Sequence, residues 1–220
     1  MAKIALILSG CGVYDGSEIH EACGALLALR RAGAQVVACA PSGPQVHVVD
    51  HRSGQPEAGA TRDILAESAR LVRGDIHPLA GVAATDVDGV LLPGGFGAAK
   101  NLCTFAADGA DCRVHPEVER FLRAAHAAGR PIAAMCIAPV ILARVFGGEG
   151  RPAVTIGTDA ATAALVERMG ARHVACEPTG VVVDDGARLV TTPAYMGTED
   201  LVEVFASAEA VVKKLLSLVS

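Results

Sequence analysis

The sequence predicts an α/β protein with a mostly parallel β-sheet covered by helices on both faces. Short apolar runs alternate with segments of helical spacing along the whole chain. The apolar runs are nearly continuous, which is typical of strands that are buried on both faces. Several of the helical segments close at a glycine, and glycine-rich turns follow two of the strands. Alternation of this kind favours a doubly wound, parallel arrangement.

The first half of the chain shows the alternation in order. The predicted elements are a strand at 3–9, a helix at 17–33 that ends at Gly33, a strand at 34–41, a strand edge or hairpin at 46–55, a helix at 61–72, and a strand at 88–95 that ends in a glycine turn. The spacing in the first helix predicts that its inward face carries Ile19, Ala22, Cys23, Leu26, Leu27 and Arg30.

The second half continues the pattern to the end of the chain. The predicted elements are a helix at 115–131 with proline in its first turn, a strand at 131–135, a helix at 138–146, a strand at 153–157, a helix at 161–170, a strand at 173–178, a hairpin at 180–193, and a closing amphipathic helix at 199–219. No internal repeat or linker interrupts the series, so we expect one domain over residues 1–220.

Composition narrows the classes of function. The formal net charge is −5, and nucleic-acid binding needs clustered basic residues, so we expect no nucleic-acid partner. No apolar stretch approaches the ~20 residues of a membrane helix, so we expect no membrane partner. The apolar run at 4–8, which precedes Cys11, is shorter than the ~7–15 residues of a signal segment. We interpret it as a strand and expect a cytoplasmic protein.

The seven cysteines do not have the spacing of a metal site. They stand at positions 11, 23, 39, 103, 112, 136 and 176, without any CxxC pair. Zinc sites use close ligand pairs, and a chain with 51% apolar residues does not need a disulfide scaffold. We expect most of these cysteines to be small buried side chains, and we expect no metal or organic cofactor.

Three turns are expected at the same edge of the sheet. In parallel sheets the functional site lies beyond the carboxyl ends of the strands, which here are the turns after Leu8, Leu92 and Met135. The first turn has glycines at 10, 12 and 16, one residue off the dinucleotide-binding pattern. The second strand lacks the acidic residue that such a site uses on ribose, which disfavours a dinucleotide.

Cys136 has two interpretations of about equal weight on position alone. It stands between a predicted strand and a predicted helix, where the helix N-terminus lowers the pKa of a thiol. Small neighbours such as Ala134 and Ala138 would permit a sharp nucleophile elbow. The alternative is a cysteine that fills the core, which is the usual fate of this residue. The glycine turn at 94–95 could supply an amide that binds an oxyanion, or could be an ordinary tight turn.

Glu18 also has two interpretations. Asp15 and Glu18 fit a capping box in which Asp15 is the N-cap, and the sequence alone favours this structural role. The functional hypothesis is that Glu18 points at a catalytic thiol. Glu21, one turn further on, is expected to be solvated.

Taken together, the motifs resemble one known family closely. The segments ILSGCGVYDGSEIHEA (7–22), PGGFGAAKNL (93–102), MCIAP (135–139), TIGTD (155–159) and TTPAYM (191–196) are similar to the ElbB family, a branch of the PfpI-like, class I glutamine amidotransferase-like superfamily. The resemblance covers essentially the whole chain. It implies a flavodoxin-like sandwich with the reactive cysteine, Cys136, on a nucleophile elbow. It also implies that Glu18 is the acid at the thiol and that the amides of Gly95 and Ile137 are the oxyanion donors.

The resemblance further implies an enzyme. Proteins of this branch are described as glyoxalases that convert glyoxal to glycolate without glutathione, and a deglycase role has been suggested for the same chemistry. Homodimers are expected at the level of the family. Older descriptions tie the branch to isoprenoid biosynthesis, which these residues do not support.

The sequence departs from the superfamily at the histidine. The residue after Cys136 is Ile137, where PfpI-type peptidases have histidine, and the late segment 191–200 offers none. Amide cleavage needs a base that protonates a leaving amine, so glutaminase and peptidase activities are disfavoured. Addition of a thiolate to an aldehyde expels no leaving group, which favours glyoxal with Glu18 as the proton carrier.

Two other functions remain open from the sequence. Cys136 could be oxidised in a redox or electrophile sensor, with Glu18 stabilising the sulfinate. The protein could also bind a small apolar metabolite beside an inert Cys136. A sensor reacts once, whereas an enzyme turns over.

Overall fold

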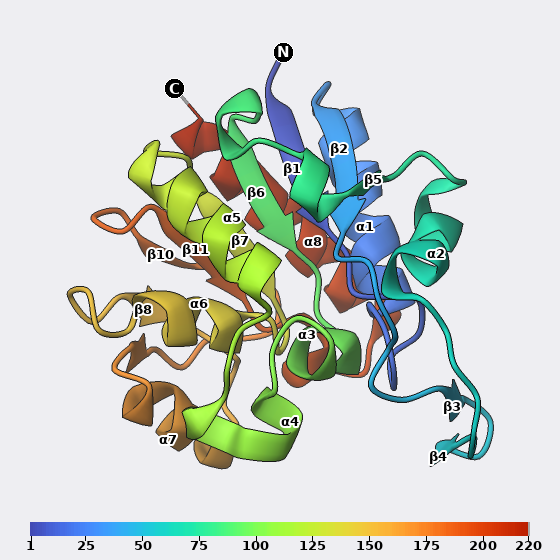
Figure 1. Ribbon diagram of the computed structural model, residues 1–220. Helices are drawn as coiled ribbons and strands as arrows, with labels where there is room; N and C mark the ends of the chain where they lie inside the picture. Colours follow the sequence, from blue (N-terminus) through green and yellow to red (C-terminus); the bar gives the residue numbers. More distant parts are fainter. Residues whose placement is uncertain (220) are drawn as a thin grey trace.

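A seven-stranded sheet forms the centre of the protein. The computed structural model describes residues 1–219. The strand order is β10-β11-β7-β6-β1-β2-β5, and only β10 runs antiparallel to its neighbour. The bounds are β1 (Lys3–Ile7), β2 (Gln35–Ala40), β5 (His77–Pro78), β6 (Gly89–Leu92), β7 (Ile132–Met135), β10 (Val182–Asp184) and β11 (Leu189–Thr192). Helices cover both faces, which confirms the predicted fold class (Figure 1).

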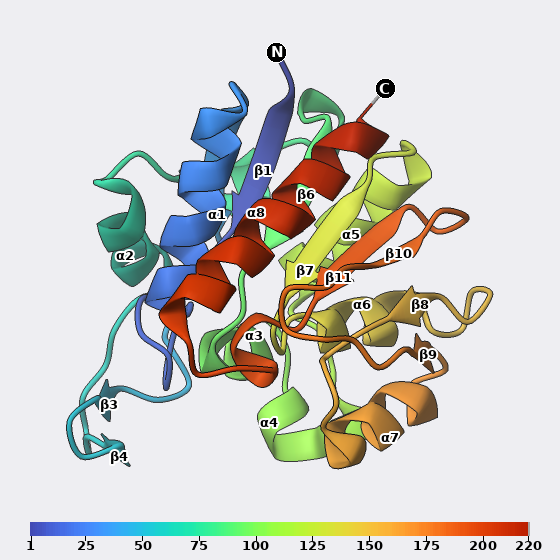
Figure 2. The ribbon, with the colours of Figure 1, turned by 180° about the vertical axis from the view of Figure 1, so that it is seen from behind.

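Each face of the sheet packs against its own set of helices. One face carries α5 (Pro116–Ala127) and α6 (Pro139–Phe146), and the other carries α1 (Ile19–Arg31) and α8 (Leu201–Leu218), as Figures 1 and 2 show from opposite sides. Successive strand residues point to opposite faces, so β1 sends Ile7 into the first core and Leu6 into the second. The parallel strands are therefore buried on both sides, as their continuous apolar runs predicted.

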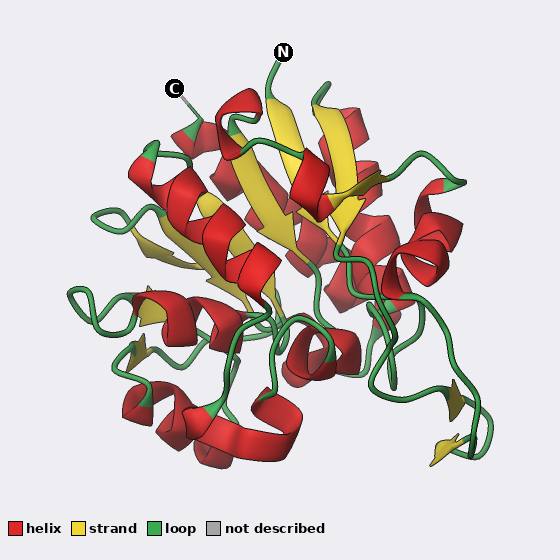
Figure 3. Ribbon diagram, viewed as in Figure 1, coloured by secondary structure: helices red, strands yellow, loops and turns green. Residues whose placement is uncertain are grey.

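Short elements complete the structure, and Figure 3 shows how much of the lower edge consists of loops. They are β3 (Val49–Asp50), β4 (Gln55–Pro56), β8 (Ala153–Val154), β9 (Arg172–His173), α2 (Ile64–Ser68), α3 (Phe96–Lys100), α4 (Phe105–Asp108), α7 (Ala160–Arg168), and the 3₁₀ helices η1 (Ala69–Val72), η2 (Leu79–Gly81), η3 (Ala84–Asp86), η4 (Gly109–Asp111) and η5 (Ala194–Met196). No helix within residues 1–219 is long and apolar enough to cross a membrane.

Two predicted strands are shorter than expected and lie outside the central sheet. The runs at 153–157 and 173–178 form only β8 and β9, which pair with each other in parallel. Beyond Val154, the amide of Thr155 donates to the side-chain hydroxyl of Thr191 in β11 at 2.9 Å, and not to a backbone carbonyl of β9. The last bond of the pair runs from the Val174 amide to the Val154 carbonyl at 2.9 Å.

The buried face of α1 differs from the predicted one. Ile19, Cys23 and Leu27 are exposed, while the buried positions are Glu21, Ala22, Gly24, Ala25, Ala28 and Leu29. The reason is the partner helix: α1 packs against α8 through its small residues, and a Cβ on Gly24 would stand 3.0 Å from the Ala208 Cβ. Because α1 and α8 pack closely, the small residues of α1 face α8. Glu21 lies on the same side of α1 and is therefore buried.

Candidate active site

Cys136 lies on the turn between β7 and α6, at the carboxyl edge of the sheet. Its φ is 58°, a left-handed value that costs a non-glycine residue roughly 1 kcal/mol. Its backbone N–H donates to the Thr192 carbonyl at 3.0 Å, which fixes this conformation. The side chain is only 7% exposed. A strained turn that lifts one side chain out of the strand is the geometry of a nucleophile elbow.

Two backbone amides interact with the sulfur. The N–H groups of Gly95 and Ile137 donate toward Cys136 and lower its pKa. Gly95 has a φ of 92° and is the N-cap of α3, and Ile137 directly follows the elbow. The two predicted amide donors therefore converge on the predicted nucleophile from two separate turns, one after β6 and one after β7.

Glu21 provides the carboxylate that contacts the thiol. Glu21 is fully buried, and the Cys136 thiol donates a hydrogen bond to it. Its Oε2 accepts from the Gly94 amide at 2.8 Å, and its Oε1 accepts from the Tyr195 amide at 3.3 Å. The prediction that Glu21 is solvated is wrong, because packing of α1 on α8 turns this position inward.

Burial and a neighbouring charge set the titration of the pair. Loss of hydration and the nearby Glu18 raise the pKa of Glu21 from 4.5 to about 7. Loss of hydration and the Glu21 carboxylate raise the pKa of the Cys136 thiol well above its ordinary value. Near neutral pH the thiol is therefore protonated. The Glu21 carboxyl group beside it has a pKa of about 7, so it can both accept and donate a proton at this pH.

Glu18 occupies a different position from the one predicted. Its side chain accepts from the Glu21 amide at 2.8 Å and makes Glu18 the N-cap of α1. Asp15, predicted to be the N-cap, accepts instead from the Val49 amide at 2.7 Å. The carboxylate that accepts from the Cys136 thiol is Glu21, so we transfer the proposed proton-carrying role from Glu18 to Glu21.

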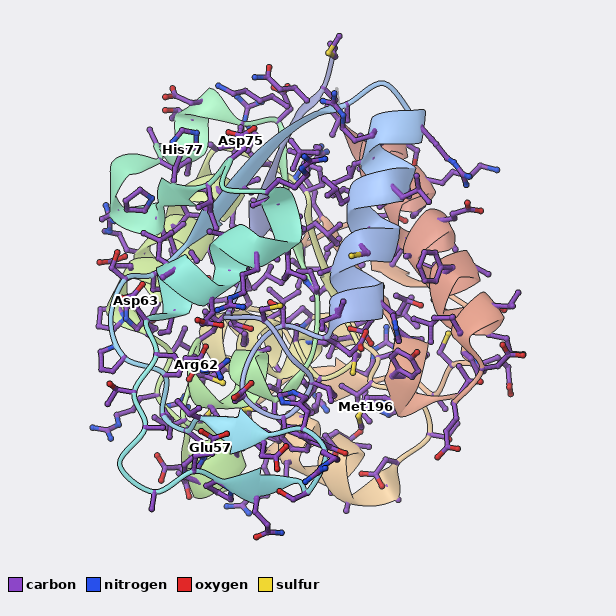
Figure 4. The ribbon with its side chains drawn as sticks, turned by 90° about the vertical axis from the view of Figure 1, so that its right-hand side faces the viewer. Glu57, Arg62, Asp63, Asp75, His77 and Met196 are labelled. Atoms are coloured by element: carbon purple, nitrogen blue, oxygen red, sulfur yellow. The ribbon has the colours of Figure 1, made fainter. Side chains whose placement is uncertain are left out.

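Tyr195 and His20 border the site on its solvent side. The Tyr195 hydroxyl and His20 Nδ1 lie 2.8 Å apart, which connects η5 to α1. His20 Nδ1 is also 3.6 Å from Glu18 Oε1. Figure 4 shows Met196, the next residue in η5, near the amino-terminal end of α1. No hydrogen bond joins a histidine to Cys136 within residues 1–219, and no group of three or more His, Cys, Asp and Glu in that part of the chain could hold a metal ion.

Gly94 has no space for a side chain. A Cβ at this position would stand 2.5 Å from the Cys136 Cβ, 2.9 Å from its sulfur and 2.8 Å from Glu21 Oε2. We expect Gly94→Ala to separate the thiol from the carboxylate and to cost about 1–3 kcal/mol of stability, as overpacking does. Urea unfolding would measure the loss. Gly148→Ala is the control, because nothing lies within 4 Å of a Cβ there. Equal stability of the two variants would contradict the close packing of this site.

Sequence reasoning missed two residues that build the site. Glu21 could have been found from the Gly24, Ala25 and Ala28 face of α1, since small residues mark where two helices approach closely. Asn101 connects three segments: its Nδ2 donates to the carbonyls of Ser9 and Asp15, both at 2.8 Å, and its Oδ1 accepts from the Val46 amide at 3.0 Å. Nothing in the sequence around Asn101 signals these contacts.

Fold and elbow together define a class of protein: an α/β sandwich with a buried cysteine on a strand–turn–helix elbow. The chain belongs to the DJ-1/PfpI family, because the sequence model of that family matches residues 5–206. It is 48% identical, over 99% of its length and 83% of the relative's, to the human "Glutamine amidotransferase-like class 1 domain-containing protein 3, mitochondrial". It is 36% identical to the zebrafish "ES1 protein, mitochondrial", over 90% of this chain and 78% of the relative.

Solved structures agree with this family. An "isoprenoid biosynthesis protein with amidotransferase-like domain" from Ehrlichia chaffeensis superposes with a TM-score of 0.90 at 33% identity and covers 98% of this chain and 99% of its own. Glyoxalase III from Candida albicans superposes with a TM-score of 0.61 at 13% identity, over 100% of this chain and 98% of its own, which shows a shared fold alone.

The names of the relatives correct one expectation. The human and zebrafish proteins are both described as mitochondrial, which contradicts the predicted cytoplasmic location. The expectation depended on the absence of a signal segment before Cys11, and that test addresses secretion only.

Proposed function

We propose that the protein is a glutathione-independent glyoxalase of the ElbB type that converts glyoxal to glycolate, with Cys136 as the nucleophile. The observation that supports the proposal most strongly is that the Cys136 sulfur and the buried Glu21 carboxylate lie side by side: a Cβ on Gly94 would stand 2.9 Å from the sulfur and 2.8 Å from Glu21 Oε2. Burial and the nearby Glu18 raise the pKa of this carboxyl group to about 7. A carboxylate in this state can take a proton and return it near neutral pH. Deglycase activity would use the same steps.

The first step joins the thiol to one carbonyl of glyoxal. As the sulfur attacks the carbon, the S–H proton moves to Glu21, and the developing alkoxide accepts hydrogen bonds from the amides of Gly95 and Ile137. The free energy of forming a buried thiolate is thereby lowered, because the negative charge moves from the sulfur to the substrate oxygen while the S–H bond breaks. Glu21 then returns this proton to the alkoxide oxygen. The product is a thiohemiacetal that is covalently bound to Cys136, and Glu21 is again a carboxylate that can accept a proton.

The remaining steps move protons within the bound substrate and add one water. The C–H proton of the thiohemiacetal carbon leaves to a base, and a proton enters at the neighbouring carbon through an enediol. One carbon is thereby oxidised to a thioester and the other is reduced to an alcohol, so no external oxidant is needed. Water then cleaves the thioester, which releases glycolate and restores the thiol. Glu21 is the proton carrier that we assign to these transfers.

The missing histidine favours this reaction over amide cleavage. Within residues 1–219 the hydrogen-bond partner of the thiol is a carboxylate, and His20 is held by Tyr195. A carboxyl group that has just taken the thiol proton can return it to carbon or oxygen of the same substrate. We also propose that residues 1–220 form a single domain, and the family resemblance leads us to propose a homodimer.

Turnover tests the proposed function. Glyoxal is supplied to the wild-type protein without glutathione, and glycolate is measured over time, with glutamine as the control substrate. We expect many molecules of glycolate per chain and no ammonia from glutamine. One modification of Cys136 followed by arrest would instead identify an electrophile sensor, and release of ammonia would identify an amidotransferase.

A further inference from the structure

A cleft lies at the carboxyl edge of the sheet, and Cys136 is not among its lining residues. Its volume is about 450 Å³, and it runs between the loop that follows β2 and the segment from α3 to the start of α5. Figure 4 shows that loop, with Glu57, Arg62 and Asp63 along its continuation. We propose that this cleft binds a small organic anion with an apolar body, held at its carboxylate or phosphate group by Arg113, Lys100 and His115.

The charge of the lining is the first observation. Lys100, Arg113 and His115 line the cleft, and no Asp or Glu is among its lining residues, although the 24 Asp and Glu residues of the whole chain outnumber its 19 Lys and Arg residues. Two carboxylates on flanking elements have other partners. Asp63 accepts from the amides of Gly43 and Ala66, and Asp108 accepts from the Thr104 hydroxyl. The lining of the cleft is thus positively charged, whereas the chain as a whole has a net charge of −5.

Arg113 is the strongest anion-binding group of the three. It is exposed and makes no ion pair with a carboxylate within residues 1–219. It also borders a neighbouring cleft that contains Glu119 and Glu149, but Arg123 pairs with those two carboxylates at 2.9 and 2.6 Å. A guanidinium group that keeps its donors free can bind a carboxylate or phosphate through two parallel hydrogen bonds.

Lys100 and His115 add donors around Arg113. The Lys100 ammonium group donates to the Tyr14 carbonyl at 3.0 Å, which leaves other N–H bonds available. The His115 Nδ1 accepts from the Glu117 amide at 3.3 Å, so a neutral ring carries its proton on Nε2. His115 is the N-cap of the 12-residue helix α5, whose positive dipole end also favours an anion.

The other walls of the cleft are apolar. Ile64 and Val114 are buried behind it, Pro44 and Pro116 border it, and Val46 is exposed although it is a large hydrophobic residue. Asn101 also lines the cleft, but its amide group already bonds to Ser9, Asp15 and Val46. An apolar ligand body would cover Val46, whereas inorganic phosphate alone would leave that surface in water.

Binding of four probes tests the proposal. The protein is the full-length Cys136→Ser variant, so that the result does not depend on the proposed glyoxalase chemistry. Hexanoate and hexyl phosphate carry the two anionic groups on the same tail, hexylamine reverses the charge, and inorganic phosphate lacks the tail. Calorimetry gives the affinities, and amide NMR shifts locate the binding.

The expected pattern is specific. We expect hexanoate or hexyl phosphate to bind with shifts at residues 42–46 and 113–115, and the tailless phosphate and hexylamine to bind more weakly. Arg113→Gln should weaken the anion by about fivefold, the upper range of an exposed ion pair, and added salt should weaken it further. Arg120→Gln is the matched control, because Arg120 is exposed on α5 but does not line the cleft.

Several outcomes would overturn the proposal. They are no binding of either tailed anion, equal binding of hexylamine, equal loss in the Arg113→Gln and Arg120→Gln variants, or shifts confined to other residues. Preference for hexanoate over hexyl phosphate would identify a carboxylate ligand, and the reverse would identify a phosphate ester.

Discussion

Cys136→Ser is expected to lower glycolate formation from glyoxal by at least about 1000-fold, because a serine hydroxyl in this site lacks the nucleophilicity of sulfur. The fold should be retained, since the substitution is close to isosteric and the elbow is held by the backbone bond from Cys136 to Thr192. Steady-state glycolate formation measures the effect, and circular dichroism reports the fold.

Cys39→Ser is the matched control for the loss of a buried thiol. Cys39 is fully buried in β2, and its sulfur contacts only the Leu6 carbonyl at 3.8 Å in the hydrogen-bond network of the described chain. The Cys39→Ser variant should be less stable than the wild type but should keep its glyoxalase activity, because Cys136 is unchanged. Undiminished activity in Cys136→Ser would remove the nucleophile from the proposed mechanism.

Glu21→Gln is expected to lower activity by about 100- to 10,000-fold, the range that a positioned proton carrier contributes. Glutamine keeps the shape and can still accept from the amides of Gly94 and Tyr195, but it cannot take the thiol proton. The rate of the wild type should rise as pH increases through about 7, because Glu21 ionises there. The rate of Glu21→Gln should show no such rise. The pH dependence of kcat measures both.

Stability should depend on pH in the opposite direction. The pKa of Glu21 is about 7 in the folded protein and 4.5 ordinarily, so between these values the folded state holds more protons than the unfolded state. The wild type is therefore expected to lose about 3 kcal/mol of unfolding free energy as pH rises from about 4.5 to 7 through this group, and Glu21→Gln should not. Urea unfolding across this range gives the comparison.

Glu18→Gln separates the two glutamates. The glutamine side chain would keep an oxygen that can accept from the Glu21 amide, so the helix cap should survive. The structure leads us to expect near wild-type activity in this variant, with a somewhat lower pKa for Glu21 because the Glu18 charge raises it. Large loss in Glu18→Gln and none in Glu21→Gln would restore the original assignment from the sequence.

The sequence predicted the sheet and the elbow because both depend on local patterns. Continuous apolar runs are a direct consequence of burial on two faces, and the small residues around Cys136 are what a sharp turn needs. The rule that parallel strands end at one edge predicted that the turns after Leu92 and Met135 meet, and the family resemblance supplied Gly95 and Ile137 as the amide donors on these turns. In each case the relevant neighbours were close in sequence or fixed by topology.

The acid at the thiol could not be predicted in the same way. Glu18 and Glu21 are three residues apart at the start of one helix, so the choice between them depends on how α1 is rotated against the sheet and α8. That rotation comes from the approach of Gly24 to Ala208, a contact between residues 184 positions apart. Large apolar residues suggested the opposite rotation, but Ile19 and Leu27 lie on the outside.

The protonated state of Cys136 has a consequence for selectivity between oxidants and aldehydes. Peroxides react with thiolates, and a buried thiol beside a carboxylate supplies almost none, so the resting protein should survive conditions that oxidise an exposed, acidic cysteine. An aldehyde brings its own oxygen to the amides of Gly95 and Ile137, and the sulfur loses its proton only as that oxygen gains charge. The Cys136 thiol should therefore be unreactive until an aldehyde binds beside it.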